Sequence, residues 1–238
     1  MKSAANLPLL TTDQMVEVDR LMIEEWHISL IQMMENAGRC LAEMTRQHLG
    51  GRVAGKQVVV LSGTGNNGGG GMVAARHLHN WGAQVDVVVA GSIDRLKEVP
   101  ALQRKIMQKM GLGISNPQLD TADVIIDALI GYGLRGTPRP PIADWIAQAN
   151  ASHQPIISLD TPSGLDATSG VPSESCIRAA VTLTLALPKM GLMKSEAKPY
   201  VGDLFLADIG VPPEVYAAPS IGLEVVSPFG SNSIVKIA

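Results

Sequence analysis

Asn67, Asp127, Asp160 and Ser163 each lie at or just after the end of a short apolar segment. In an open α/β sheet the ligand crevice lies beyond the carboxyl ends of the strands, so these side chains are expected to converge. Their amide, carboxylate and hydroxyl oxygens suit a hard cation, and a carboxylate in an apolar sheet serves as a general acid or base. For Asp127, a role as the cap of a helix or turn is the alternative.

A glycine-rich turn at residues 63–71 reads Gly-Thr-Gly-Asn-Asn-Gly-Gly-Gly-Gly and contains a formal G-x-G-x-x-G spacing. It follows the apolar run Val58–Leu61 and precedes a helical pattern with Met72, Ala75 and His79 on one face. Strand, turn and helix in this order favour dinucleotide binding. Glycines let the backbone approach a pyrophosphate, and free N–H groups at a helix start attract an anion. The turn therefore predicts a nicotinamide-dinucleotide-like ligand, with a simple tight connection as the alternative.

Two features argue against an ordinary Rossmann dehydrogenase. No acidic residue ends the second apolar run, Val85–Ala90, and Asp86 lies too early in it to bind a ribose easily. Asn66 and Asn67 also occupy the turn, and phosphate binding alone does not explain this pair. A dehydrogenase is therefore the disfavoured interpretation.

Basic side chains give weaker signals. Lys189 follows an apolar strand, where it is either a solvated tip or a partner for a phosphate or carbonyl group in the crevice. His77 and His79, at positions i and i+2 of a predicted helix, point in different directions and form no ligand pair.

Apolar runs and helical patterns alternate through the middle of the chain. The expected strands are Val58–Leu61, Val85–Ala90, Val124–Leu129, Ile156–Leu159, Val181–Leu187 and Leu204–Ala207. The expected helices are Thr12–Glu25, one with Met34, Ala37, Leu41 and Met44 on one face, Gly71–Trp81, Arg95–Met110 and Ile142–Ala151. Right-handed βαβ units then predict an α/β fold, a Rossmann-like three-layer α/β/α sandwich with a mostly parallel sheet.

We expect one domain over residues 1–238, with a helical N-terminal segment at about 11–50 and an α/β core at about 56–213. After Pro212 the periodicity is lost, and Leu223–Val226 is a candidate edge strand.

Composition excludes several classes of protein. Hydrophobic residues make up 46% of the chain and charged residues 17%, which excludes a disordered protein. A net charge of −3 without a basic run argues against a nucleic-acid partner. No stretch approaches the length of about 18 apolar residues that spans a membrane, and Cys40 and Cys176 form neither a zinc motif nor a disulfide framework. A soluble, reducing compartment, the cytoplasm, is expected.

Several motifs, in order along the chain, resemble the YjeF N-terminal domain family, the NAD(P)H-hydrate epimerases that include the apolipoprotein A-I-binding proteins. The resemblance runs from about residue 9 to about residue 213. The motifs are Thr12–Met15, Met34–Arg39, Gly65–Gly69 with Val73–Leu78, Asp127–Gly131, Asp160–Asp166, Pro188–Lys189, and Gly202–Leu204 with Ala207–Gly210.

The resemblance implies a substrate and a set of site residues. The substrates would be the R and S forms of NADHX and NADPHX, interconverted at C6 by a homodimer in nucleotide repair, with the S form passed to a separate NAD(P)HX dehydratase. Asp160 would be the catalytic acid or base, and Asn67, Asp127 and Ser163 would bind a potassium ion. The residues implied to bind substrate are Asn66, Asn67, Gly68, Gly69, Gly70, Gly131, Tyr132, Gly133, Leu134, Arg135, Gly136, Thr137 and Asp160; Lys189 is added as the possible crevice partner.

Two departures from the family pattern lie in this expected pocket. Gly70 stands where relatives usually carry an acid, and Tyr132 stands in a loop that usually reads Gly-Thr-Gly. A missing acceptor costs about 1 to 3 kcal/mol when its partner is left unsatisfied, and Tyr132 either narrows the pocket or stacks on a ring. The alternative to an active epimerase is therefore a weak or inactive nucleotide-sensing or protein-binding module on the same fold.

Overall fold

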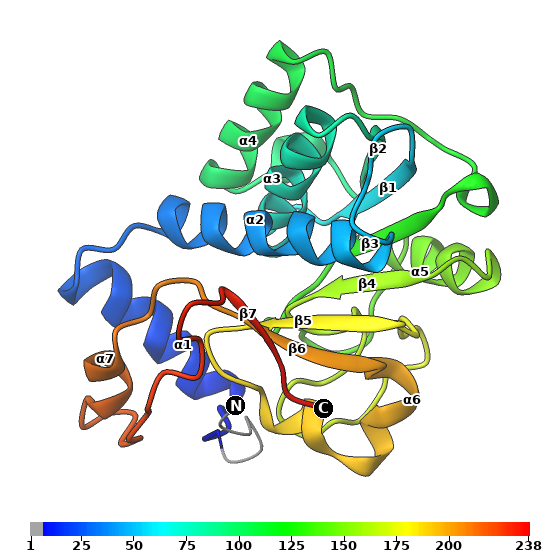
Figure 1. Ribbon diagram of the computed structural model, residues 1–238. Helices are drawn as coiled ribbons and strands as arrows, with labels where there is room; N and C mark the ends of the chain where they lie inside the picture. The colour runs from blue at the N-terminus through cyan, green and yellow to red at the C-terminus, as the bar shows by residue number, and fades with distance from the viewer. Residues whose placement is uncertain (1–6) are drawn as a thin grey trace.

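The computed structural model describes residues 7–238 and contains one seven-stranded sheet with helices on both faces (Figure 1). The strands are β1 Gln57–Ser62, β2 Gln84–Val89, β3 Val124–Ala128, β4 Ile156–Leu159, β5 Val181–Leu185, β6 Asp203–Ala207 and β7 Ile234–Lys236. The α-helices are α1 Thr12–Arg20, α2 Leu30–His48, α3 Asn66–Asn80, α4 Glu98–Lys109, α5 Ile142–Ala151, α6 Lys198–Val201 and α7 Pro213–Ala217. A π-helical turn, Leu21–Glu25, continues α1, and short 3-10 turns lie at Ile93–Arg95, Leu119–Thr121, Met190–Met193 and Ser195–Ala197.

The strand order is β2-β1-β3-β4-β5-β6-β7, and only the last pair, β6 with β7, is antiparallel. This confirms the predicted mostly parallel α/β sheet. The chain reverses its direction of winding between β1 and β3, which are neighbours in the sheet. Such a topological switch point opens a crevice at the carboxyl ends of the two strands.

Two strands differ from the sequence analysis. The antiparallel edge strand is Ile234–Lys236, not Leu223–Val226, because residues 205–207 of β6 pair with the later segment. Leu223 and Val225 instead pack on the apolar cluster around α1 and α7. β5 also ends at Leu185 rather than Leu187, since Ala186 adopts φ +65°, outside the range of an extended strand.

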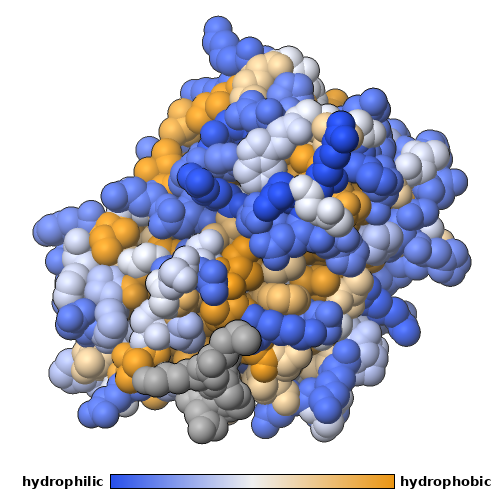
Figure 2. Space-filling view, in the orientation of Figure 1, coloured by the Kyte–Doolittle hydropathy of each residue, from blue (hydrophilic) through white to orange (hydrophobic). Residues whose placement is uncertain are grey.

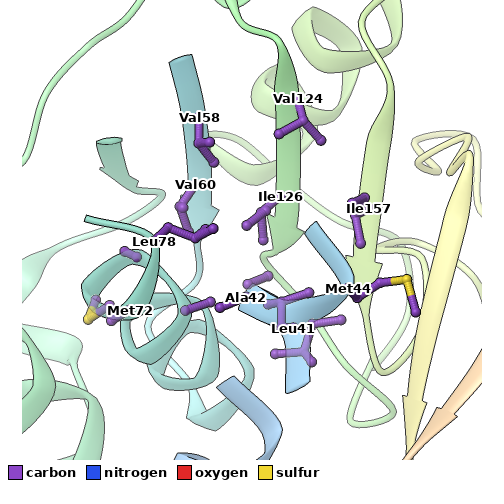
Figure 3. Close-up of a cluster of buried hydrophobic side chains, with 14 of the residues drawn as sticks. Leu41, Ala42, Met44, Val58, Val60, Met72, Leu78, Val124, Ile126 and Ile157 are labelled. Carbon is purple, nitrogen blue, oxygen red and sulfur yellow. The ribbon is translucent and has the colours of Figure 1, made fainter. Parts of the chain in front are cut away.

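Apolar side chains from the two faces of the sheet form separate clusters. One cluster lies under α2, α3 and α4 and includes Leu41, Met72 and Leu78 against Val60 and Ile126 (Figure 3). The other lies under α5 and the segment before β5. Because both faces are covered, the central strands β3 and β4 are buried along their whole length, which explains why each has only one polar residue.

Four consecutive glycines, Gly68–Gly71 (the glycine run), lie inside α3, which begins at Asn66 rather than at the expected Gly71. A Cβ on Gly68 would lie 2.0 Å from the Gly63 carbonyl oxygen, and one on Gly69 would lie 2.6 Å from Met34 Sδ. A Cβ on Gly71 would meet Ala128 at 2.6 Å. The absence of side chains at positions 68, 69 and 71 therefore allows the first turns of α3 to pack between α2 and the sheet.

The N-terminal segment begins with a capping box, in which the Thr11 side chain accepts from Gln14 N and Gln14 Oε1 accepts from Thr11 N. Leu10 pairs with Lys189 beyond β5, so α1 is attached to the carboxyl end of the sheet.

Hydrophilic residues cover most of the face seen in Figure 2, with apolar residues gathered near its centre. Within residues 7–238, no helix combines the length and apolar character needed to cross a bilayer.

Replacing Gly38 by Ala tests the close approach of α2 and α3. A Cβ at this position would lie 2.4 Å from Val73 Cβ and 2.7 Å from the Gly70 carbonyl oxygen. Although Ala favours a helix, we expect overpacking to lower the free energy of unfolding by about 1–3 kcal/mol in denaturant titration. Gly113→Ala is the control, because a Cβ there meets nothing within 4 Å. Equal stability of Gly38→Ala and wild type would contradict the packing argument.

Candidate active site

A cavity of about 380 Å³ opens at the switch point between β1 and β3. Its size falls within the range of small-molecule sites, and apolar side chains from α1 and α2 form one wall. The residues that line it are Met15, Asp19, Leu30, Met33, Met34, Ala37, Thr64, Gly65, Asn66, Asn67, Gly70, Lys97, Leu129, Ile130, Gly131, Tyr132, Gly133, Ile142, Leu159, Asp160, Leu185 and Ile209.

Asp160 lies directly after β4, is 3% exposed and lines this cavity. Its backbone adopts φ +68°, a left-handed conformation that is uncommon for a residue other than glycine. One carboxylate oxygen accepts from Tyr132 N at 2.9 Å, and the other forms an ion pair with Lys189 Nζ. Backbone and side chain therefore fix Asp160 as a carboxylate at the cavity wall.

Lys189 is fully buried behind Asp160 and does not line the cavity. Besides Asp160, its ammonium group donates to Leu185 O at 2.8 Å and to Thr184 Oγ1 at 3.3 Å. All three N–H groups thus have partners inside the protein. Neither a solvated tip nor a direct substrate partner describes this lysine; it is the counter-ion of Asp160.

Asp127 is fully buried at the end of β3 and accepts four hydrogen bonds. Ser163 donates through Oγ at 2.5 Å and through its backbone N at 2.9 Å, and Ser158 Oγ and Leu129 N donate at 2.8 and 3.2 Å. Burial raises the pKa of the Asp127 carboxyl, and these hydrogen bonds partly offset that rise. The Asp127 carboxylate therefore links β3, β4 and the loop after β4. Its hydrogen bond from Leu129 N, two residues along the chain, corresponds to the turn-capping role considered above.

Asn67 and Asp160 converge on Gly131. A Cβ on Gly131 would lie 2.9 Å from Asp160 Oδ2 and 3.0 Å from Asn67 Oδ1, so only glycine allows this close approach. Asn67 Nδ2, Asn66 Oδ1 and Thr161 Oγ1 are buried atoms without a hydrogen-bond partner in the described part of the chain. Asn66 and Asn67 line the cavity, and their orphaned atoms indicate a missing polar partner, such as an ion, a water or a ligand.

The structure divides the predicted substrate-binding residues into two groups. Asn66, Asn67, Gly70, Gly131, Tyr132, Gly133 and Asp160 line the cavity. Gly68, Gly69, Leu134, Arg135, Gly136, Thr137 and Lys189 are not among the residues that line it. Gly68 and Gly69 are buried and closely packed, whereas Arg135, Gly136 and Thr137 are exposed.

Asp19 and Lys97 are lining residues that the sequence analysis missed. No periodic pattern in the sequence indicates that Lys97 lines a site. For Asp19 such a pattern exists, because Asp19 lies four residues after Met15 and therefore on the side of α1 that packs inward. An acidic residue on the buried side of an amphipathic helix was the available clue.

Replacing Ser163 by Ala tests the network around Asp127. Ser163 Oγ donates to Asp127 and accepts from Ile130 N at 2.8 Å, so the change leaves two buried polar groups short of a partner. We expect the free energy of unfolding to fall by about 1–3 kcal/mol in denaturant titration. Exposed Ser169, whose hydroxyl bonds only within its own loop, gives the control Ser169→Ala, for which a change below about 0.5 kcal/mol is expected. Equal losses in both variants would rule out a special role for the network.

Comparison with known proteins agrees with this architecture. The family model described as YjeF-related protein N-terminus matches residues 30–191. An NAD(P)H-hydrate epimerase of Dehalogenimonas lykanthroporepellens is 43% identical over 96% of this chain and 92% of its own length, and one of Rhodopirellula baltica is 34% identical over 90% and 89%.

A bifunctional NAD(P)H-hydrate repair enzyme of Moorella thermoacetica is 38% identical over 88% of this chain, which spans only 42% of that longer protein. The crystal structure of yeast ynu0 superposes with a TM-score of 0.83 and 25% identity, covering 97% of this chain and 100% of the yeast chain. On this evidence the chain belongs to the family of YjeF-related N-terminal domains.

Proposed function

We propose that this protein is an NAD(P)H-hydrate epimerase, an isomerase that interconverts the R and S forms of NADHX and NADPHX. The observation that carries the proposal is the cavity at the switch point, in which a buried carboxylate, Asp160, faces an apolar wall. The relatives named as NAD(P)H-hydrate epimerases match nearly the whole chain, including this region.

The cavity has separate surfaces for the two ends of a hydrated dinucleotide. Met15, Leu30 and Met33 offer an apolar wall to a partly saturated nicotinamide ring. Gly65 and Asn66, at the N-terminus of α3, offer backbone N–H groups and the positive end of the helix dipole to a phosphate. The ring carbon that inverts would then lie near Asp160 and Gly131.

Inversion at C6 needs a proton transfer beside a carbon that carries both nitrogen and oxygen. Either the hydroxyl group leaves and water adds to the other face, or the hydrated ring opens and closes again. Asp160 accepts or returns the proton in both routes. Two of its lone-pair positions are taken by Lys189 and Tyr132 N, and a carboxylate has about four, so capacity for a substrate proton remains.

A potassium ion is the proposed cofactor, held by Asn67, Asp127 and Ser163. All three offer oxygen ligands, the class preferred by hard cations, and the unpartnered amide atom of Asn67 supports a missing partner. Rotation of that amide by half a turn exchanges its oxygen and nitrogen, which would aim the oxygen at the orphaned position. When bound, the ion would supply positive charge near the substrate and fix the loop after β3.

The wider setting of the reaction is part of the same proposal. Some relatives are named as bifunctional repair enzymes, so we infer that the S form passes to an NAD(P)HX dehydratase. A homodimer and a cytoplasmic location are kept as predictions.

Gly70 favours a second candidate, a nucleotide-binding module without activity. It lines the cavity at the position where the family pattern has an acid, and a Cβ there would lie 2.7 Å from Leu159 Cδ2. Leu159 therefore occupies part of the space that an acidic side chain would take. Binding of NADPH without epimerisation would support this candidate.

Replacing Asp160 by Asn tests the first candidate. The R form of NADPHX is supplied with an S-specific dehydratase, and NADPH formation is followed. We expect wild type to exceed the spontaneous rate and Asp160→Asn to lose about 10²–10⁴-fold in kcat/KM, since the amide cannot take a proton. Asp144→Asn, at an exposed position of α5, is the control and should keep full activity. A wild-type rate no faster than the spontaneous one would refute the epimerase.

Exchange of potassium for choline tests the cofactor without an activity assay. A cation that binds only the folded protein stabilises it by RT ln(1 + [L]/Kd), about 2.7 kcal/mol at a hundred times Kd. We expect a higher melting temperature in potassium chloride than in choline chloride at equal ionic strength, and a smaller difference for Asn67→Ala. Asn80→Ala, at the exposed end of the same helix, should respond like wild type. Equal melting temperatures of wild type in both salts would exclude the ion.

A further inference from the structure

A second carboxyl group, Asp19, lines the same cavity as Asp160. It comes from α1, which the pairing of Leu10 with Lys189 attaches to the carboxyl end of the sheet. Asp19 Oδ2 accepts a hydrogen bond from the Tyr132 hydroxyl. Tyr132 also donates its backbone N–H to Asp160, so one tyrosine contacts both carboxyl groups and holds them apart by its own length.

The surroundings of the two carboxyl groups differ. Asp160 has the buried ammonium group of Lys189 as a direct partner, whereas Asp19 has only the neutral hydroxyl of Tyr132. Burial raises the pKa of Asp19, with the Asp160 carboxylate acting in the same direction and the Tyr132 hydroxyl and the more distant Lys189 acting against it. Two carboxyl groups whose environments differ in this way are the usual arrangement of an acid and a base in one site.

One oxygen of Asp19 is available to a ligand. Oδ1 makes no hydrogen bond within residues 7–238, and it is not among the buried atoms that lack a partner. Asp19 is one of the residues that line the cavity, so this carboxyl group lies at the space that a substrate would fill. Tyr132, the residue that departs from the family pattern, fixes the position of the other oxygen through its hydroxyl group.

We propose that Asp19 is a second proton-transfer residue of this site, acting as the acid when Asp160 acts as the base. This inference rests on the proposed epimerase function and adds to it a residue from the N-terminal helix. Tyr132 is the positioning residue that sets the separation between the two groups.

The proposed exchange balances in protons and electrons. Asp19 donates its proton to the C6 hydroxyl oxygen, the C6–O bond breaks with its electron pair leaving as water, and the N1 lone pair forms the C6–N1 double bond. Water then adds to C6 from the opposite face, returns the electron pair to N1 and gives a proton to Asp160. The two carboxyl groups have exchanged protonation states, which leaves the site ready for the reverse epimerisation.

The experiment compares Asp19→Asn and Tyr132→Phe with wild type in the coupled NADPH assay. Asparagine still accepts the Tyr132 hydrogen bond but cannot donate an acidic proton, whereas phenylalanine removes only the hydroxyl group. We expect kcat/KM of Asp19→Asn to fall about 10²-fold or more and that of Tyr132→Phe to fall less. Asp13→Asn, exposed on the same helix and outside the cavity, is the matched control. Melting temperatures of all variants check folding.

The pH profile gives a readout that a structural role would not change. An acid must be protonated, so the wild-type kcat/KM should fall as pH rises through the raised pKa of Asp19, and this alkaline limb should disappear in Asp19→Asn. Full activity of Asp19→Asn in an active wild-type background, or a larger loss in Tyr132→Phe, would overturn the proposal while leaving the epimerase intact. An inactive wild type would overturn the epimerase itself, and the inference with it.

Discussion

The ion pair of Lys189 and Asp160 is the interaction on which the site depends. Both side chains are removed from water, and the removal of either one would leave an uncompensated buried charge, at a cost of about 3–5 kcal/mol. The pair joins the end of β4 to the segment after β5, and Lys189 in turn pairs with Leu10 ahead of α1. Tyr132 N completes the pair from the loop after β3. Three strand ends and the N-terminal segment therefore meet at one carboxylate.

The glycine run shows how packing and binding share one segment. Gly68, Gly69 and Gly71 have no room for a side chain, because α3 lies close to its own preceding turn, to α2 and to the sheet. This tight seat fixes the N-terminus of α3 at the cavity, with Asn66 and Asn67 exposed to it. The glycines thus place the helix end and its two amides at the cavity.

The buried carboxyl groups in and near the cavity have different partners. Asp160 and Asp127 are both buried carboxyl groups, but one is balanced by a lysine and the other only by neutral donors. Asp127 links neighbouring loops through four hydrogen bonds, while Asp160 accepts two and keeps lone pairs for a ligand. Asp19 adds a third carboxyl group in a different environment. In the proposed mechanism, such differences would let similar side chains serve as structural group, base and acid.

The sequence by itself determined the α/β class and the parallel strands, because apolar runs are local features. Of the four polar residues expected to converge, the structure joins Asp127 to Ser163 by hydrogen bonds and brings Asn67 and Asp160 together at Gly131. Local patterns also placed α5 correctly. Only the tertiary structure decided that Lys189 turns inward to Asp160, that α3 starts at Asn66, and that Asp19 and Tyr132 contact each other across 113 residues. These outcomes depend on how closely elements distant in sequence pack and on which charged groups become buried beside one another. No periodic pattern in the sequence contains that information.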